Sequence, residues 1–141
     1  MTRANQKFEL EFPSTIQQVA KVEKFLEHIK ATLEIDDERF YKILVATTEA
    51  VNNGIIHGNK RDINKKVCLR CWVENTWLLI SVHDEGPGFD SDHIPDPRKD
   101  ENLLLDHGRG VFLIRSLMDK VEFSNDPTGA SVVMTLGLGA K

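Results

Sequence analysis

The chain has 141 residues, of which 40% are hydrophobic and 28% charged, and its formal net charge is −4. This composition is typical of one folded domain of ordinary size and excludes a disordered chain. Without a Lys/Arg run or a long apolar stretch, the sequence argues against direct nucleic-acid binding and against a membrane helix. The N-terminal segment also lacks the apolar core of a signal peptide, so we expect a cytoplasmic protein.

The first half of the chain predicts one strand followed by two helices. Apolar and polar residues alternate over residues 8–12, which indicates a short strand whose exposed apolar side chains would suit a dimer edge. Helical spacing over residues 13–33 predicts a helix with Ser14 as its N-cap. A second helix is expected over residues 36–59, where Gly58 provides a natural C-terminal stop.

The second half predicts two strands, a long loop, a helix and two final strands. The loop is rich in glycine and proline, and loops of such length in compact domains are usually lids or disordered segments. The order of elements predicts a single α/β two-layer (α+β) domain over residues 1–141, with helices on one face of a mixed, largely antiparallel sheet. The first two strands are expected over residues 66–74 and 77–84 and the loop over residues 85–110. The helix is expected over residues 110–121 and the final strands over residues 121–125 and 130–138.

Asp84 ends a strand in which every second residue is apolar, so its carboxylate has the parity of the buried row. A carboxylate there needs donors, and the exocyclic amine of adenine would provide one, whereas the carbonyl oxygen of guanine would repel it. Gly86 and Gly88 would let the backbone approach a flat ring closely. The alternative is that this segment is only a turn, for which Asp, Gly and Pro are common residues.

A second glycine pair, Gly108 and Gly110, stands just before the last expected helix. Free backbone N–H groups and the positive end of the helix dipole make such a position a good phosphate cradle. The segment matches neither the dinucleotide-binding fingerprint nor the Walker A loop. A flexible segment leading into a helix is the equally acceptable alternative.

Glu49, Asn53 and His57 lie four residues apart on one stripe of the second helix. If a triphosphate lay against this stripe, the carbonyl oxygen of Asn53 would bind Mg²⁺, which needs only one or two protein ligands. Glu49 would accept a proton from the group that attacks the terminal phosphate. His57 would hydrogen-bond locally, and the alternative for the whole stripe is a solvated helix face.

Together these elements resemble the GHKL ATPase superfamily, which contains gyrase, Hsp90, histidine kinases and MutL. The segment EAVNN, with Glu49 and Asn53, looks like the N box of the superfamily. Its two glycine boxes look like the Asp84 segment and the GxG of residues 108–110. The resemblance covers essentially the whole chain and implies a Bergerat-type fold that binds Mg-ATP, with a lid over residues 85–107.

Within the superfamily, the segments TEAVNNGIIHGN and GRGVFLIRSLMDKVEF are most similar to bacterial anti-sigma factor serine kinases. This resemblance implies a homodimer that holds a sigma factor inactive and phosphorylates a serine of an anti-sigma antagonist of the STAS type. It also implies ATP and Mg²⁺ as cofactors, Glu49 as the catalytic base and Asn53 as the metal ligand.

Two departures from the family pattern concern the ends of the nucleotide. Kinase members often carry an arginine just before the second glycine box, where this chain has Asp106 and His107. The nearest cations are Arg109 inside the box and Arg98 and Lys99 in the lid, so the cation that would face the terminal phosphate is unassigned. The final strand usually opens with Gly-Thr near the adenine. Here Ser131, two residues after Gly129, would supply the hydroxyl through a water.

Two other functions stay open at this level. A nucleotide-gated partner switch with little kinase activity would explain the missing lid arginine. The catalytic ATP-binding domain of a histidine kinase is less favoured, because fewer than fifty residues precede the N box and they are used by one strand and one helix. His28 is also followed by Ile29 rather than by the acidic residue usual after a phosphoacceptor histidine.

Overall fold

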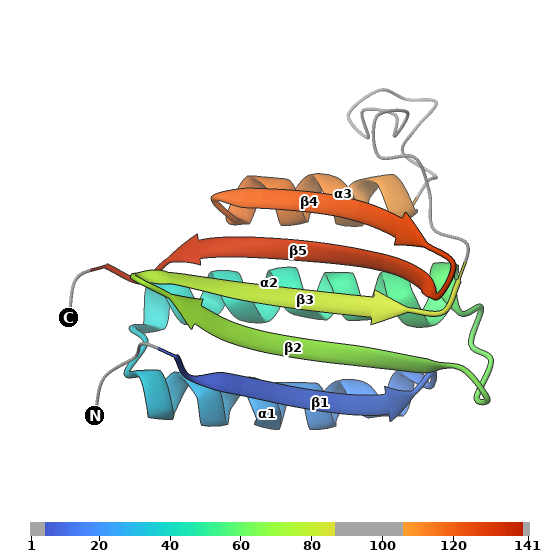
Figure 1. Cartoon of the computed structure of the whole chain (residues 1–141), viewed down its shortest axis with the longest axis horizontal. Helices are drawn as coiled ribbons and strands as arrows, with labels where there is room; N and C mark the ends of the chain where they lie inside the picture. The colour runs from blue at the N-terminus through green and yellow to red at the C-terminus, as the bar shows by residue number, and fades with distance from the viewer. Residues whose placement is uncertain (1–4, 87–105, 140–141) are drawn as a thin grey trace.

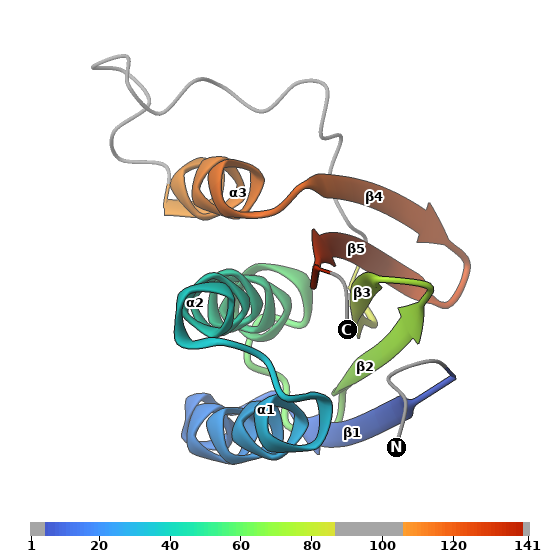
Figure 2. The same ribbon diagram turned by 90° about the vertical axis from the view of Figure 1, so that its left-hand side faces the viewer.

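The computed structural model describes residues 5–86 and 106–139, with residues 106–109 described by their backbone alone. Within this part of the chain, three helices pack against one face of a five-stranded sheet, and Figure 2 shows the two layers edge-on. The strands are β1 (Lys7–Pro13), β2 (Lys66–Glu74), β3 (Trp77–Asp84), β4 (Lys120–Asp126) and β5 (Gly129–Gly137). The helices are α1 (Val19–Leu33), α2 (Asp37–Asn53) and α3 (Asp106–Leu117), with the short turns η1 (Ile16–Gln18) and η2 (Gly54–Gly58).

The strands lie in the order β1-β2-β3-β5-β4, and Figure 1 shows the sheet face-on with the helices behind it. All four pairings are antiparallel, so the predicted two-layer fold is confirmed, while the expected mixed character of the sheet is not found in the described strands. The antiparallel order follows from short connections such as the turn between β2 and β3, where Asn75 has a positive φ of 57°.

The core lies between the two layers and is built from alternate residues of the strands and one stripe of each helix. Strand β1 belongs to this core, because Phe12 is 1% exposed and Phe8 and Leu10 pack against buried residues. The predicted exposed apolar edge at residues 8–12 is therefore wrong. These side chains face the helix layer, where Phe8 contacts His28 of α1 edge-on at 6.1 Å between ring centroids.

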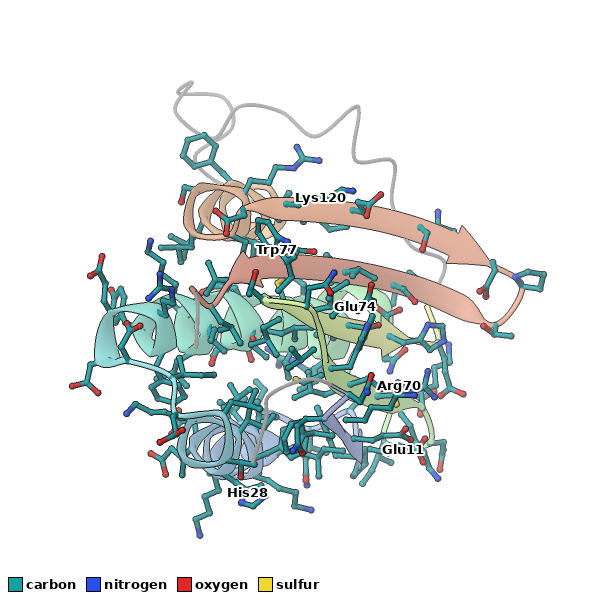
Figure 3. All side chains as sticks on the ribbon, turned by 60° about the vertical axis from the view of Figure 1, so that its left-hand side comes forward. Glu11, His28, Arg70, Glu74, Trp77 and Lys120 are labelled. Atoms are coloured by element: carbon teal, nitrogen blue, oxygen red, sulfur yellow. The ribbon has the colours of Figure 1, made fainter. Side chains whose placement is uncertain are left out.

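Charged side chains occupy the sheet face that points away from the helices. Arg70 of β2 pairs with Glu9 of β1 at 3.1 Å, and Lys66 pairs with Glu11 at 3.3 Å. Figure 3 labels Arg70 and Glu11 on the strands, with His28 on the separate helix layer. No helix among the described residues is long and apolar enough to cross a membrane.

The segment before α1 differs from its prediction. Ser14 is not a helix N-cap, because it is fully buried and donates its hydroxyl to the carbonyl oxygen of Lys65 at 2.7 Å. The chain first forms the turn η1, and α1 begins at Val19. Ser14 therefore joins the end of β1 to the loop before β2.

Helix α2 begins as predicted, with its acidic N-terminus capped by Asp36, which accepts a hydrogen bond from the backbone N–H of Arg39 at 2.8 Å. The Arg39 side chain also donates to the carbonyl oxygen of Gly137 at 2.9 Å, which ties this helix end to the end of β5. At the other end, α2 widens into the π-helical turn η2, and the N–H of Asn59 donates to the carbonyl oxygen of Gly54.

Helix α3 begins at Asp106, four residues earlier than the predicted start at residue 110, and ends at Leu117 rather than at residue 121. Gly108 and Gly110 thus lie inside the helix rather than before it. The first four N–H groups of any helix lack intrahelical partners, so Gly108 still lies at the electropositive end of α3, and Gly110 is the fifth residue of the helix. Strand β4 begins at Lys120 and takes the last residues that were assigned to the helix.

Candidate nucleotide-binding site

A pocket opens where the end of α2, the turn η2, the end of β3 and the start of β5 meet. Its walls combine apolar surface with a few polar groups, which is the usual composition of a site for a flat organic ligand. The residues lining it are Ala50, Asn53, Gly54, His57, Gly58, Val82, Asp84, Ile114, Phe123, Asn125, Ala130, Ser131 and Val132. The predicted residues Asn53, Asp84 and Ser131 are among them.

Glu49 and Asn53 converge on Gly110, and of these three residues only Asn53 lines the pocket. A methyl carbon on Gly110 would lie 3.0 Å from the Glu49 carboxylate oxygen Oε2 and 3.2 Å from the Asn53 amide nitrogen. Both side chains are half-buried, so the alternative of a fully solvated stripe does not hold for them. His57, one turn further on, lies on the pocket wall and is exposed.

Asp84 lines the pocket at the end of β3. Leu78, Ile80 and Val82 are buried along the same side of the strand, so Asp84 continues the buried row as predicted. Burial raises the pKa of the Asp84 carboxyl, although the backbone N–H of Gly86, which donates to Oδ1 at 2.8 Å, acts in the opposite direction. A partly desolvated carboxylate therefore faces the pocket and gains from any further donor.

Three glycines are closely packed around Asp84: Gly58 against its carboxyl group, Gly129 against its backbone carbonyl and Gly86 against Gly58. A methyl carbon on Gly58 would lie 2.4 Å from the Asp84 carboxyl carbon, and one on Gly86 would lie 2.1 Å from the Gly58 carbonyl oxygen. Gly129 has a φ of 144°, and a methyl carbon there would lie 1.9 Å from the Asp84 carbonyl oxygen. Sequence reasoning missed the role of Gly58 and Gly129, because neither glycine has a local signal that connects it with Asp84.

We expect Gly58→Ala to lower the free energy of unfolding by about 1–3 kcal/mol, as overpacking substitutions do, because the added methyl group must displace the Asp84 carboxyl group. Urea denaturation measures the change. The matched control is Gly54→Ala, whose methyl carbon would lie at an ordinary contact distance of 3.5 Å from Asp84 Cβ. Equal destabilisation by the two substitutions would contradict the close contact between Gly58 and Asp84.

Other predicted residues are described only in part. Gly88, and most of the lid predicted over residues 85–107, lie outside the described residues, and Gly108 and Arg109 are described only as backbone in the first turns of α3. The Ser131 hydroxyl lies 2.7 Å from His83 Nδ1 on the neighbouring strand. Its contact with adenine through a water stays a prediction.

Asn59 is a second residue that sequence reasoning missed. It directly follows η2, is 1% exposed and hydrogen-bonds to Ser14, Lys66 and Glu85, which come from three different segments. In the sequence, Asn59 is only the residue that follows the expected C-terminal glycine of a helix, and nothing in the local pattern indicates that it is buried.

A family model described as the histidine kinase-like ATPase domain matches residues 12–136. The chain therefore belongs to the histidine kinase-like ATPase (GHKL) family, and this membership implies ATP binding. The pocket suits that ligand, because its apolar walls end at a partly desolvated acceptor, Asp84, and at the amide of Asn53.

Within this family, the chain is similar to proteins named serine-protein kinase and anti-sigma factor. Serine-protein kinase RsbW of Bacillus subtilis (strain 168) is 28% identical over 133 residues, which cover 90% of this chain and 82% of the relative. Anti-sigma F factor of Oceanobacillus iheyensis is 35% identical over 97 residues, which cover 67% of this chain and 66% of the relative. The sequence-based expectation of this family is thereby confirmed.

Solved structures show the same fold. The RsbU and RsbW domains of Rv1364c from Mycobacterium tuberculosis match with a TM-score of 0.72 at 17% identity, over 96% of this chain and 33% of that chain. The catalytic domain of the histidine kinase ThkA matches with a TM-score of 0.58 at 14% identity, over 95% of this chain and 99% of that one. This chain thus spans one third of the first structure and nearly all of the second.

Proposed function

We propose that this protein is an ATP-dependent serine kinase of the anti-sigma factor type. The observation that carries the proposal is that Asp84, an adenine-matching carboxylate, and Asn53 line one pocket, and that Glu49 lies next to Asn53 at Gly110. Its relatives are named serine-protein kinase and anti-sigma F factor, which supports the same activity and partners.

Asp84 would accept a hydrogen bond from the exocyclic amine of adenine. Its carboxyl group is held against Gly58 and already accepts from Gly86, so it presents an ionised oxygen in a fixed direction. Apolar side chains such as Val82 and Ile114 would cover the faces of the purine ring. The keto oxygen of guanine would face this carboxylate without a donor between them.

Asn53 would hold Mg²⁺ through its carbonyl oxygen, and the start of α3 would face the phosphates with its free N–H groups, with Gly108 in the first turn and Arg109 and Gly110 directly after it. Bound Mg²⁺ supplies neutralisation of charge on the phosphate oxygens. Glu49 would take the proton from the attacking serine hydroxyl, whose oxygen bonds to the γ-phosphorus. The bond from that phosphorus to the β-phosphate oxygen breaks and ADP leaves.

The protein partners proposed are those that the names of the relatives imply. A sigma factor would be bound and kept inactive, and a protein would receive the phosphate on a serine. The sequence resemblance adds that this phosphate acceptor would be an anti-sigma antagonist of the STAS type. A homodimer and a cytoplasmic location belong to the same proposal.

A second candidate function is a nucleotide-gated partner switch that binds ATP and transfers phosphate poorly or not at all. The feature that favours it is the sequence before the second glycine box, where Asp106 and His107 stand in place of the arginine that kinase members often carry. Both functions use the same adenine end of the site.

Incubation with γ-labelled Mg-ATP and STAS-type proteins of the same genome tests the proposal. We expect label on a serine of one of these proteins. Tight ATP binding without transfer to any of them would favour the switch instead. Absence of ATP binding by folded protein would overturn both functions.

A further inference from the structure

The buried side-chain amide of Asn59 uses both of its N–H donors and its carbonyl oxygen. Its Nδ2 donates to Ser14 Oγ at 2.7 Å and to the Lys66 carbonyl oxygen at 3.0 Å, and its Oδ1 accepts from the Glu85 backbone N–H at 2.7 Å. The carbonyl of Lys66 can only accept and the N–H of Glu85 can only donate, so these partners require this orientation of the amide. An asparagine that is 1% exposed and makes three hydrogen bonds with its side chain holds its neighbours rigidly.

The bond from Asn59 to Glu85 acts directly beside the adenine-facing carboxylate. Asp84 precedes Glu85 in the chain, and the following N–H, from Gly86, donates to Asp84 Oδ1. The Glu85 carboxylate in turn accepts from the Lys66 backbone N–H at 2.6 Å. The corner after β3 is thus bound to the end of η2 through Asn59 and to the start of β2 through Glu85.

The backbone of the segment after β3 is closely packed against the turn η2. The Gly86 backbone lies against Gly58, so that a methyl carbon on Gly86 would lie 2.1 Å from the Gly58 carbonyl oxygen. The Gly58 backbone lies equally close to the Asp84 carboxyl group. Asn59 follows Gly58 directly, so its hydrogen bond to Glu85 sets the spacing between the two backbones that enclose this carboxyl group.

We propose that Asn59 is a positioning residue for adenine selectivity, because it holds the Asp84 carboxylate in the direction that the exocyclic amine requires. The inference rests on the proposed function and adds to it a residue that touches neither the nucleotide nor the reacting atoms. A hydrogen bond to a charged group depends strongly on its direction. Loosening of the segment after β3 would therefore weaken the hydrogen bond between Asp84 and the exocyclic amine, while the apolar contacts to the purine ring would stay.

The test compares ATP with purine riboside triphosphate, which lacks the exocyclic amine, by calorimetry with Mg²⁺ present. We expect the wild-type protein to prefer ATP by at least about tenfold, the ordinary effect of a hydrogen bond to a charged group. In Asn59→Ala this preference should fall to about unity, while the affinity for purine riboside triphosphate stays within about threefold of wild type. If Asn59→Ala does not fold, Asn59→Ser, whose side chain is too short to reach Glu85, is measured with the same expectation.

Two controls separate positioning from stability. Ser14→Ala removes a buried hydroxyl of the same network but leaves the bond from Asn59 to Glu85, so it should lower stability and keep the preference for ATP. Asn64→Ala removes an exposed asparagine side chain from the loop that also contains Asn59, and it should change neither the stability nor the preference for ATP.

The outcomes distinguish the two proposals. An unchanged ATP preference in the Asn59 variants, or an equal loss for both nucleotides, overturns the positioning role and leaves the kinase proposal standing. Failure of the wild-type protein to bind either nucleotide overturns the proposed function itself.

Discussion

Asp84→Asn should weaken ATP binding by at least about tenfold and leave the fold intact. The substitution replaces one carboxylate oxygen by an N–H donor, which cannot accept from the adenine amine. It also removes the charge that makes the remaining hydrogen bond strong. Burial raises the pKa of Asp84, so the ionised form is the costly one in the folded protein at neutral pH, and the neutral amide should unfold at no lower temperature. Calorimetry with Mg-ATP and thermal denaturation measure the two effects.

The matched control for this variant is Asp37→Asn. Asp37 lies at the first turn of α2, with its side chain 98% exposed and paired only with Lys30 among the contacts described. We expect its ATP affinity to equal that of wild type. Unchanged ATP binding by Asp84→Asn would mean that this carboxylate does not face the base.

Glu49→Gln should keep ATP binding and reduce phosphate transfer by about 100-fold to 10,000-fold, the usual contribution of a general base. The amide keeps the shape of the carboxyl group and its approach to Gly110, but it cannot take the serine proton. Transfer of labelled phosphate to the STAS-type acceptor, under single-turnover conditions, measures the chemical step separately from binding.

Glu38→Gln is the corresponding control, since Glu38 is an exposed acid in the first turn of the same helix. It should transfer phosphate at the wild-type rate. Transfer at that rate by Glu49→Gln would remove Glu49 from the chemistry, and loss of ATP binding would assign it to the binding of nucleotide or metal instead.

The strands and helices follow closely from the pattern of the chain. The predicted ranges 66–74 and 77–84 coincide with β2 and β3, because alternation with buried Val, Leu and Ile is a strong signal for a strand that is half covered. The start of α2 was equally clear, since Asp36 is a good N-cap ahead of a periodic apolar stripe.

The sequence-based predictions are wrong where a residue has a partner far away in the chain. Ser14 has the residue type of a helix cap, but its hydroxyl is used by Lys65, which lies 51 residues away in the chain. The alternation over residues 8–12 identified a strand without showing that α1 covers its apolar face. The early start of α3 shows that glycines do not stop a helix when packing against α2 supports it.

The sequence by itself determined the order of the elements, the helical stripe that carries Glu49 and Asn53, and the place of Asp84 at the end of a buried row. Each of these depends on residues within a few positions of one another, where the geometry of a helix or strand fixes the neighbours. Only the tertiary structure decided that Gly58 and Gly129 enclose Asp84 and that Asn59 binds Glu85, 26 residues on, and Ser14, 45 residues back. Local periodicity reports which face of an element is buried, whereas the packing of the layers selects which distant backbone group lies against that face.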